Sequence, residues 1–301
     1  MCSSDLPSFA GGIAFAKDGD VLTNTCASAN GTLFRLDVQT TLPAQNGTST
    51  LHPVSSTPNV ALGCGMVNGK NRNVYTNTTS GVVEFDPATG TKIAGPFTFE
   101  GGNGNALGIS ADPISGDLVY VTDGTLIRVD AGLTTHSVFS DALKGKFIDG
   151  VFFDPTGNFL FAANRNQQAV AIIGRDGALV QQVSIGHEPD GIAFHAGGSK
   201  FVITNNVDGT MSKISFVGND PSKSATVSQF ASGGARGDLS QVGPDGALYL
   251  TQDGVRFDDG TQGSGDAIVR ICCDFVAQPG TGATTTTSAP TTTAPNTTVA
   301  A

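Results

Sequence analysis

The sequence contains no tryptophan, three tyrosines and only 16 lysines and arginines, against 26 aspartates and glutamates. Proteins that bind nucleic acid neutralise phosphates with clustered cations, and no basic stripe is present, so nucleic acid is excluded as a partner. An anionic membrane surface is disfavoured for the same reason. The formal net charge of −10 leaves cations and small neutral polar molecules, such as sugars and lactones, as candidate ligands.

Long apolar runs and several common motifs are absent as well. No segment approaches the roughly 20 apolar residues that a transmembrane helix needs, so we expect no transmembrane segment. The phosphate-binding loop that ends in Gly-Lys-Ser/Thr and the Gly-x-Ser-x-Gly nucleophile elbow do not occur. The five cysteines show no C-x-x-C zinc spacing.

Glycine is abundant, with 40 residues, and it separates short apolar runs, as is typical of a chain with many turns and short strands. Six segments align as the starts of repeats that recur at a period near forty residues, which is the period of propeller blades. These starts are 12–15, 65–67, 108–110, 150–153, 191–194 and 239–242. The sequence therefore predicts an all-β propeller, over residues 7–279, with six four-stranded blades visible.

The sixth predicted blade lacks a clear fourth strand. Only residues 275–278 could serve within the chain, but propellers commonly close with an N-terminal strand that completes the last blade. Such a strand would precede Leu6, where residues 1–6 match the translation of a short-read sequencing adapter. We therefore expect these six residues to be non-native and a signal sequence to have been lost upstream. A seventh blade lost in the same way is an open alternative.

Residues 280–301 are rich in threonine, alanine and proline and contain almost nothing to bury. This composition predicts a disordered linker or stalk, open to O-glycosylation, which would space a surface domain from a wall or another module. The alternative is a tail with no such role.

One stretch carries a resemblance to known proteins. The sequence Ile185-Gly186-His187-Glu188-Pro189-Asp190-Gly191-Ile192-Ala193-Phe194, followed by Phe201-Val202-Ile203-Thr204-Asn205-Asn206, resembles YVTN/NHL-type β-propellers. The blade starts are also similar to those of the gluconolactonase/senescence-marker propellers and, more distantly, the streptogramin-lyase-like propellers. The resemblance implies the fold but no single activity, because sensors and surface proteins share the motif with enzymes.

Three aspartates occupy one repeated position. In this fold the first strand of each blade descends beside the central channel from the ligand-binding mouth, so the residue before each start lies at that mouth. On three consecutive blades this residue is Asp149, Asp190 and Asp238. Carboxylates that converge on an axis suit Ca²⁺ or another divalent cation. The alternative is that each aspartate forms an Asx-turn with nearby backbone N–H groups.

The resemblance also implies two sets of catalytic residues. Gluconolactonase-like enzymes hold a divalent metal with a glutamate of the first blade and an asparagine and an aspartate of later inner strands, and the aspartate also acts as a base. Asp190 matches that aspartate and Asp149 stands at the asparagine position, but the first blade has Gly11 and Gly12 and no glutamate. Streptogramin lyases use His and Glu at the same mouth. In this sequence His187 and Glu188 are expected there, where they form either a base–acid pair or a solvated loop.

Further side chains are expected at the mouth. Arg236 lies just before the sixth inner strand, and Asp258 and Asp259 lie in the longest loop between a second and a third strand. That loop either extends a calcium site, forms a lid or is simply solvated. Cys26 ends a second strand and Cys64 begins the next blade, so an exported protein would be able to join them in a disulfide.

Two functions follow from these features. The first is a secreted or cell-surface binding module, expected to be monomeric, whose channel mouth binds a divalent cation, a small polar ligand or another surface protein. The second is a metal-dependent lactone hydrolase or lyase that uses Asp149, Asp190 and Asp238 as ligands and Asp190 or His187 for proton transfer.

Overall fold

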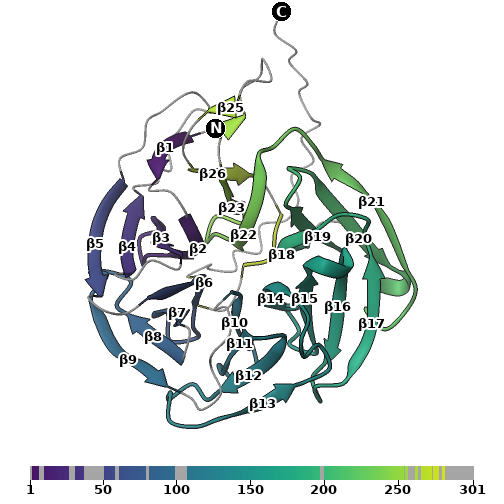
Figure 1. Ribbon diagram of the computed structural model, residues 1–301, viewed down its shortest axis with the longest axis horizontal. Coiled ribbons are helices and arrows are strands. Elements are labelled where there is room, and N and C mark those ends of the chain that lie inside the picture. The colour runs from purple at the N-terminus through teal and green to yellow at the C-terminus, as the bar shows by residue number, and fades with distance from the viewer. Residues whose placement is uncertain are drawn as a thin grey trace, which may run out of the picture.

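Six four-stranded antiparallel sheets surround a central channel in the computed structural model (Figure 1). The structure describes residues 2–6, 10–26, 31–36, 51–57, 61–78, 81–98, 107–196, 200–253, 255–256, 262–263, 266–272, 274–277 and 280–281. Each sheet is a blade whose first strand lines the channel and whose fourth strand lies at the rim. The fold class and the six visible blades are as the sequence predicts.

The strands of each blade are given from the channel outward. Blade 1 contains β2 (Ala10–Phe15), β3 (Val21–Thr25), β4 (Gly31–Leu36) and β5 (Leu51–Thr57), and blade 2 contains β6 (Leu62–Asn68), β7 (Val74–Thr78), β8 (Gly81–Phe85) and β9 (Lys92–Thr98). Blade 3 contains β10 (Ile109–Ala111), β11 (Leu118–Thr122), β12 (Thr125–Val129) and β13 (His136–Ser140), and blade 4 contains β14 (Ile148–Phe153), β15 (Phe159–Asn164), β16 (Ala169–Gly174) and β17 (Leu179–Ser184). Blade 5 contains β18 (Pro189–His195), β19 (Phe201–Asn206), β20 (Met211–Phe216) and β21 (Ala225–Ala231), and blade 6 contains β22 (Arg236–Val242), β23 (Leu248–Asp253), β26 (Asp266–Ile271) and β1 (Cys2–Leu6).

Few other elements occur in the described part of the chain. They are a short hairpin of β24 (Val255–Arg256) and β25 (Gln262–Gly263), and two short 3₁₀ turns, η1 (Arg165–Gln167) and η2 (Val217–Asn219). No helix among the described residues is long and apolar enough to cross a membrane.

Burial decreases from the channel to the rim. The first strand of blade 4, β14, is buried along its whole length, whereas most residues of the fourth strand, β17, are exposed. The core lies between neighbouring blades, where, for example, the rings of Phe161 and Phe194 pack edge to face with centroids 5.1 Å apart. A blade alone would leave these faces in water, so the blades are stable only as a set.

The N-terminal strand completes the last blade. β1 pairs antiparallel with β26, with Leu6 opposite Asp266, and it forms the outer strand of blade 6. Residues 275–278 do not serve as that strand: Phe275 instead forms an isolated bridge with His195 of blade 5. The inner strands of blades 1 and 6 touch each other, so six blades close the ring.

The described residues of the C-terminal segment contact the propeller at the end opposite the mouth. The backbone N–H of Val276 donates to the carbonyl of Phe194 at 2.8 Å. Gly280 lies against the carbonyl of Gly69 in blade 2, and Thr281 is buried. Packing on the propeller therefore continues to Thr281, next to the predicted domain end at residue 279. Residues 282–301 of the predicted linker lie outside the described residues.

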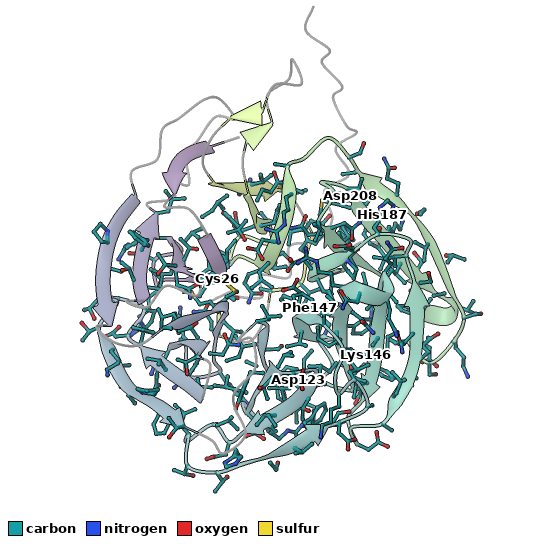
Figure 2. All side chains as sticks on the ribbon, viewed as in Figure 1. Cys26, Asp123, Lys146, Phe147, His187 and Asp208 are labelled. Carbon is teal, nitrogen blue, oxygen red and sulfur yellow. A yellow bond between two sulfur atoms is a disulfide. The ribbon has the colours of Figure 1, made fainter. Side chains whose placement is uncertain are left out.

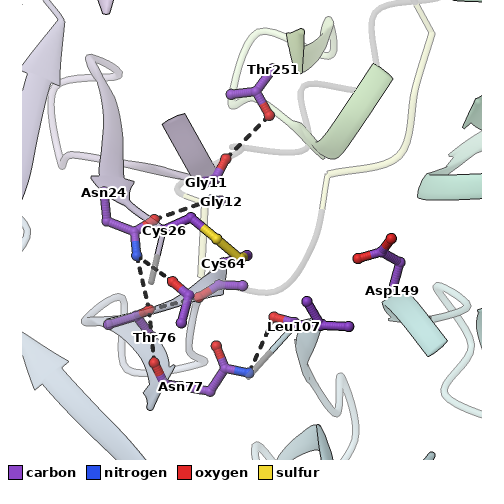
Figure 3. Close-up of a disulfide and its surroundings, with 12 residues drawn as sticks. Gly11, Gly12, Asn24, Cys26, Cys64, Thr76, Asn77, Leu107, Asp149 and Thr251 are labelled. Atoms are coloured by element: carbon purple, nitrogen blue, oxygen red, sulfur yellow. Dashed lines mark hydrogen bonds between the residues drawn. A yellow bond between two sulfur atoms is a disulfide. The ribbon is translucent and has the colours of Figure 1, made fainter. Parts of the chain in front are cut away.

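Asparagines at the ends of second strands connect each of several blades to the next. Asn24 of β3 donates to the carbonyl of Gly63 in blade 2 at 2.7 Å, and Asn77 of β7 makes the same kind of bond to blade 3 (Figure 3). Asn205 of β19 donates to the carbonyl of Asp238 in blade 6 at 2.7 Å. These bonds fix the spacing of neighbouring inner strands at the mouth.

We predict that Asn24→Ala destabilises the protein strongly. Asn24 is 1% exposed, and its loss leaves buried polar backbone groups without their partner. We expect the free energy of unfolding to fall by about 2–4 kcal/mol and the melting midpoint to fall by roughly 5–15 °C. The exposed residue Asn158 provides the control, since Asn158→Ala should change stability by less than about 0.5 kcal/mol. Equal midpoints for the two variants in a thermal melt would contradict the connecting role.

Candidate functional site

The candidate site is the mouth of the channel where the first strands begin. Because successive strands of a blade run antiparallel, the loops between second and third strands lie at this same end. The connections from one blade to the next also lie there. Residues from η1, from the loop before β18 and from the start of β22 therefore meet around one opening.

A β-bulge positions each of the three predicted aspartates. Asp149 in β14, Asp190 in β18 and Asp238 in β22 all lie where the pairing of the first strand with the second shifts register. A bulge bends a strand and redirects its side chains, which suits a position at the rim of a channel. The structure thus brings together three carboxylates that are far apart in sequence, and Asp149 and Asp190 are 5% and 1% exposed.

Arg165, which the sequence analysis missed, supplies a positive charge to this cluster. Its Nη1 lies 3.2 Å from Oδ2 of Asp149, and its Nε lies 3.0 Å from Oε2 of Glu188. Its guanidinium also lies over the ring of Phe147 at 5.5 Å. Arg165 is held in place from three sides, so it is an ordered part of the mouth rather than a free surface cation.

The carboxyl groups of Asp149 and Asp190 lie within hydrogen-bonding range of each other, so a proton on one of them can be shared with the other. Burial, followed by the negative charges of Asp149 and Asp238, raises the pKa of Asp190 well above its usual value. Burial also raises the pKa of Asp149, but the charge of Arg165 acts against this. Asp190 is therefore the member of this pair whose protonated form the site favours more strongly.

One oxygen of this pair has no partner. Oδ1 of Asp190 is buried and makes no hydrogen bond within the described part of the chain. The hydrogen bonds of Asp149 go to Arg165 and Asp190, not to nearby backbone N–H groups. The Asx-turn interpretation is therefore wrong for these two aspartates. A buried carboxyl oxygen that is left unpaired is a place where a ligand can bind.

A metal-binding geometry does not arise directly from these side chains. Among the described residues, no group of three or more His, Cys, Asp and Glu side chains is placed to hold a metal ion. Arg165 provides the positive charge next to Asp149 instead. Arg236 adds to it, because its charge favours the ionised form of Asp149.

His187 forms a second polar pair at the same mouth. Its Nδ1 lies 2.6 Å from Oδ2 of Asp208, and Figure 2 shows the two side chains next to each other. Partial burial opposes ionisation of Asp208, but hydrogen bonds from Thr210 and His187 hold its pKa below the usual value. Asp208 lies in the Asp-Gly turn between β19 and β20, a turn signal that could have identified it in the sequence.

A disulfide joins Cys26 and Cys64 on the opposite side of the mouth from Asp149 (Figure 3). Their Cα atoms are 4.4 Å apart, and they connect blade 1 to blade 2. The remaining predicted mouth residues, Asp258 and Asp259, lie outside the described residues. The described part of the mouth is thus acidic and titratable over blades 4 to 6 and cross-linked over blades 1 and 2.

No protein-family model matches this chain, and no curated protein matches it. Solved structures that are similar to it include virginiamycin B lyase from Staphylococcus aureus, with 16% identity over 88% of this chain and 85% of that chain and a TM-score of 0.60. The match to regucalcin from Agrobacterium tumefaciens has 15% identity and a TM-score of 0.60, and it covers 91% of this chain and 94% of that chain. The match to the PQQ-bound aldose sugar dehydrogenase from Streptomyces coelicolor has 17% identity and a TM-score of 0.63, and it covers 90% of this chain and 96% of that chain. These similarities show the β-propeller fold.

We predict that Asp190 makes the protein less stable as pH rises. Unfolded aspartate has a pKa of about 4, whereas folded Asp190 has a raised pKa, so the folded state holds more protons above pH 4. The free energy of unfolding should therefore fall from about pH 4 up to the raised pKa. Asp190→Asn keeps a neutral group there, so its stability should be flatter over this window and higher at its upper end.

Urea unfolding from pH 4.5 to pH 8 measures this difference. Asp141→Asn, which removes an exposed carboxylate, controls for the change in net charge. If the stability curves of the wild type and Asp190→Asn run parallel over the whole range, Asp190 does not hold the extra proton.

Proposed function

We propose that this propeller is an extracytoplasmic binding module whose channel mouth binds a small polar ligand. The observation that carries the proposal is the buried, unpartnered Oδ1 of Asp190 next to the buried carboxyl of Asp149. Most buried polar atoms of native proteins are paired, and a ligand at the mouth would complete the hydrogen bonds of this oxygen.

The chemistry of the mouth favours a ligand with several hydroxyl groups. Asp149 is an acceptor, Arg165 is a donor, and the Asp190 carboxyl is both. A polyol, sugar or lactone offers donors and acceptors that match such a set. A phosphorylated ligand is disfavoured, because the carboxylates of Asp149 and Asp238 would repel it.

The proposed location rests on the disulfide between Cys26 and Cys64. Disulfides persist in oxidising compartments and are rare in the cytosol. A propeller displayed outside the cell, with the Thr-rich segment as its stalk, accommodates this bond. Another surface protein is the alternative partner for the same mouth.

A divalent cation is the second candidate ligand of these carboxylates. The unpartnered oxygen of Asp190 suits a cation, and regucalcin, which is similar in fold, is described as a calcium-binding protein. The described side chains do not already form a three-ligand group, so they would have to move. A cation would also have to displace the proton of Asp190, which makes its binding stronger at higher pH.

Thermal melts of the full chain distinguish the two ligands. We expect one sugar or lactone, at about 100 times its dissociation constant, to add about 2.7 kcal/mol to the free energy of unfolding and to raise the midpoint by roughly 5–10 °C. Asp149→Asn should remove this rise.

The same melts in EDTA and in millimolar Ca²⁺, Mg²⁺, Mn²⁺ or Zn²⁺, at pH 6 and pH 8, test the cation. A rise with one metal that is larger at pH 8 and absent in Asp190→Asn would replace the polyol by that metal. If neither class shifts the midpoint, the mouth is not a small-ligand site.

The pair of His187 and Asp208 favours a hydrolase or lyase as the second candidate function. A carboxylate on Nδ1 fixes the tautomer of an imidazole, so that Nε2 can take a proton from a substrate or from water. In that function Asp190 would be the neighbouring proton-transfer group.

A panel of lactones tests the catalytic candidate. If the purified protein hydrolyses one of them, His187→Ala should lower kcat/KM by at least about 100-fold, while Asp208→Asn should lower it less. Both variants should retain the wild-type melting midpoint, because the two side chains are partly exposed. Turnover that is unchanged in His187→Ala would exclude this residue from catalysis.

A further inference from the structure

A second cavity lies between blades 4 and 5, at the end of the propeller opposite the mouth. Its volume is about 480 Å³, which is within the range of small-molecule sites. Phe161, Phe194 and Val202 form its buried floor, and Phe216 forms a wall. Asp154 also lines it, in the turn between β14 and β15.

The neighbouring interface shows one way in which this fold fills the same place. Between blades 3 and 4, Arg175 makes two hydrogen bonds to the buried carboxylate of Asp112, from Nη1 at 3.1 Å and Nη2 at 2.8 Å. Its Nη1 also donates to the carbonyl of Gly157 at 2.6 Å. The guanidinium therefore spans the two blades and neutralises an aspartate that directly follows an inner strand.

Between blades 4 and 5 the arginine is replaced by phenylalanine. Asp154 follows β14 as Asp112 follows β10. Strand registers place Phe216, two residues after Ile214, at the position that Arg175 occupies two residues after Ile173. The aspartate is thus retained at this interface, whereas its guanidinium partner is not.

Asp154 accordingly has only local partners. It accepts hydrogen bonds from the backbone N–H of Phe159 at 2.8 Å and from the Thr156 backbone and hydroxyl at 3.2 and 2.5 Å. No cation contacts it within the described part of the chain. Asp154 is only 8% exposed and lines the cavity. Its negative charge therefore lies at the wall of an aromatic cavity.

We propose that this cavity binds a small organic cation in which a planar amidinium or guanidinium group is attached to a flat apolar body. The charged group pairs with Asp154, as Arg175 pairs with Asp112. The apolar body packs on Phe161, Phe194 and Phe216, whose rings also favour a cation through their π-faces. Lys200 and Asp220 lie at the rim with opposite charges, so the rim itself selects neither sign.

Benzamidine, benzamide and benzoate form a matched set of probes, because they share one ring and carry a positive, neutral or negative group. We expect calorimetric titration of the full chain to show that benzamidine binds at least about tenfold more tightly than benzamide, and that benzoate does not bind. Equal binding of benzamidine and benzamide would overturn the proposal, because the charge would then play no part.

Four variants locate the binding. Asp154→Asn should weaken benzamidine about tenfold or more, and Phe216→Arg, which restores the arrangement of the neighbouring interface, should abolish it. Lys200→Gln should strengthen it, because a repelling charge is removed. Asp190→Asn, at the mouth, should leave it unchanged. Each variant is first checked for a wild-type-like circular dichroism spectrum and a cooperative melt.

Phe216→Arg keeps the test decisive if Asp154→Asn does not fold. Loss of benzamidine binding in folded Phe216→Arg supports the cavity. If benzamidine binding instead depends on Asp190 and not on Phe216, the cation binds at the mouth and the proposal is wrong.

Discussion

The close approach of the inner strands at the channel is the constraint on which the rest of the structure depends. A Cβ added to Gly108 would lie 2.5 Å from the carbonyl oxygen of Asp149, and one added to Gly150 would lie 2.3 Å from that of Asp190. Only glycine fits between strands that are so close. The same contacts set the distance between Asp149 and Asp190, so the packing that requires Asp-Gly sequences also brings the carboxyl groups together.

Because the blades repeat around the ring, sequence differences between them give the mouth two unlike halves. The six blades have similar backbones, so equivalent residues face one another around the mouth, and those of blades 2 and 3 are Cys64 and Leu107. On blades 4, 5 and 6 the same position holds the three aspartates. A ligand at the mouth would therefore meet a titratable wall on one side only, with the disulfide on the other (Figure 3). The cavity between blades 4 and 5 arises in the same way, from Phe216 at a position where the preceding interface has Arg175.

Repetition also explains what the sequence could predict. The inner, second and third strands recur with the period of the blades, and the three aspartates share one position in that period, so both were predictable. Arg165 was not, because its contacts with Asp149 and Glu188 cross from η1 to other loops and follow no repeat. The outer strand of blade 6 lies at the N-terminal end of the chain and outside the repeat, so it was predicted from the usual way in which propellers close and not from a repeated pattern.

The contrast between two buried aspartates indicates where function lies. Asp112 is fully buried, but it receives hydrogen bonds from Arg175, from Ser115 and from the backbone of Ile114, which hold its pKa below the usual value despite its burial. Asp190 is as deeply buried, yet it faces other carboxylates, has a raised pKa and leaves Oδ1 without a partner in the described part of the chain. Burial alone therefore does not account for the state of Asp190, since the same fold satisfies Asp112 completely. A buried carboxyl that is left unsatisfied in a fold that fully satisfies another buried carboxyl is the kind of local violation that proteins retain for binding or catalysis.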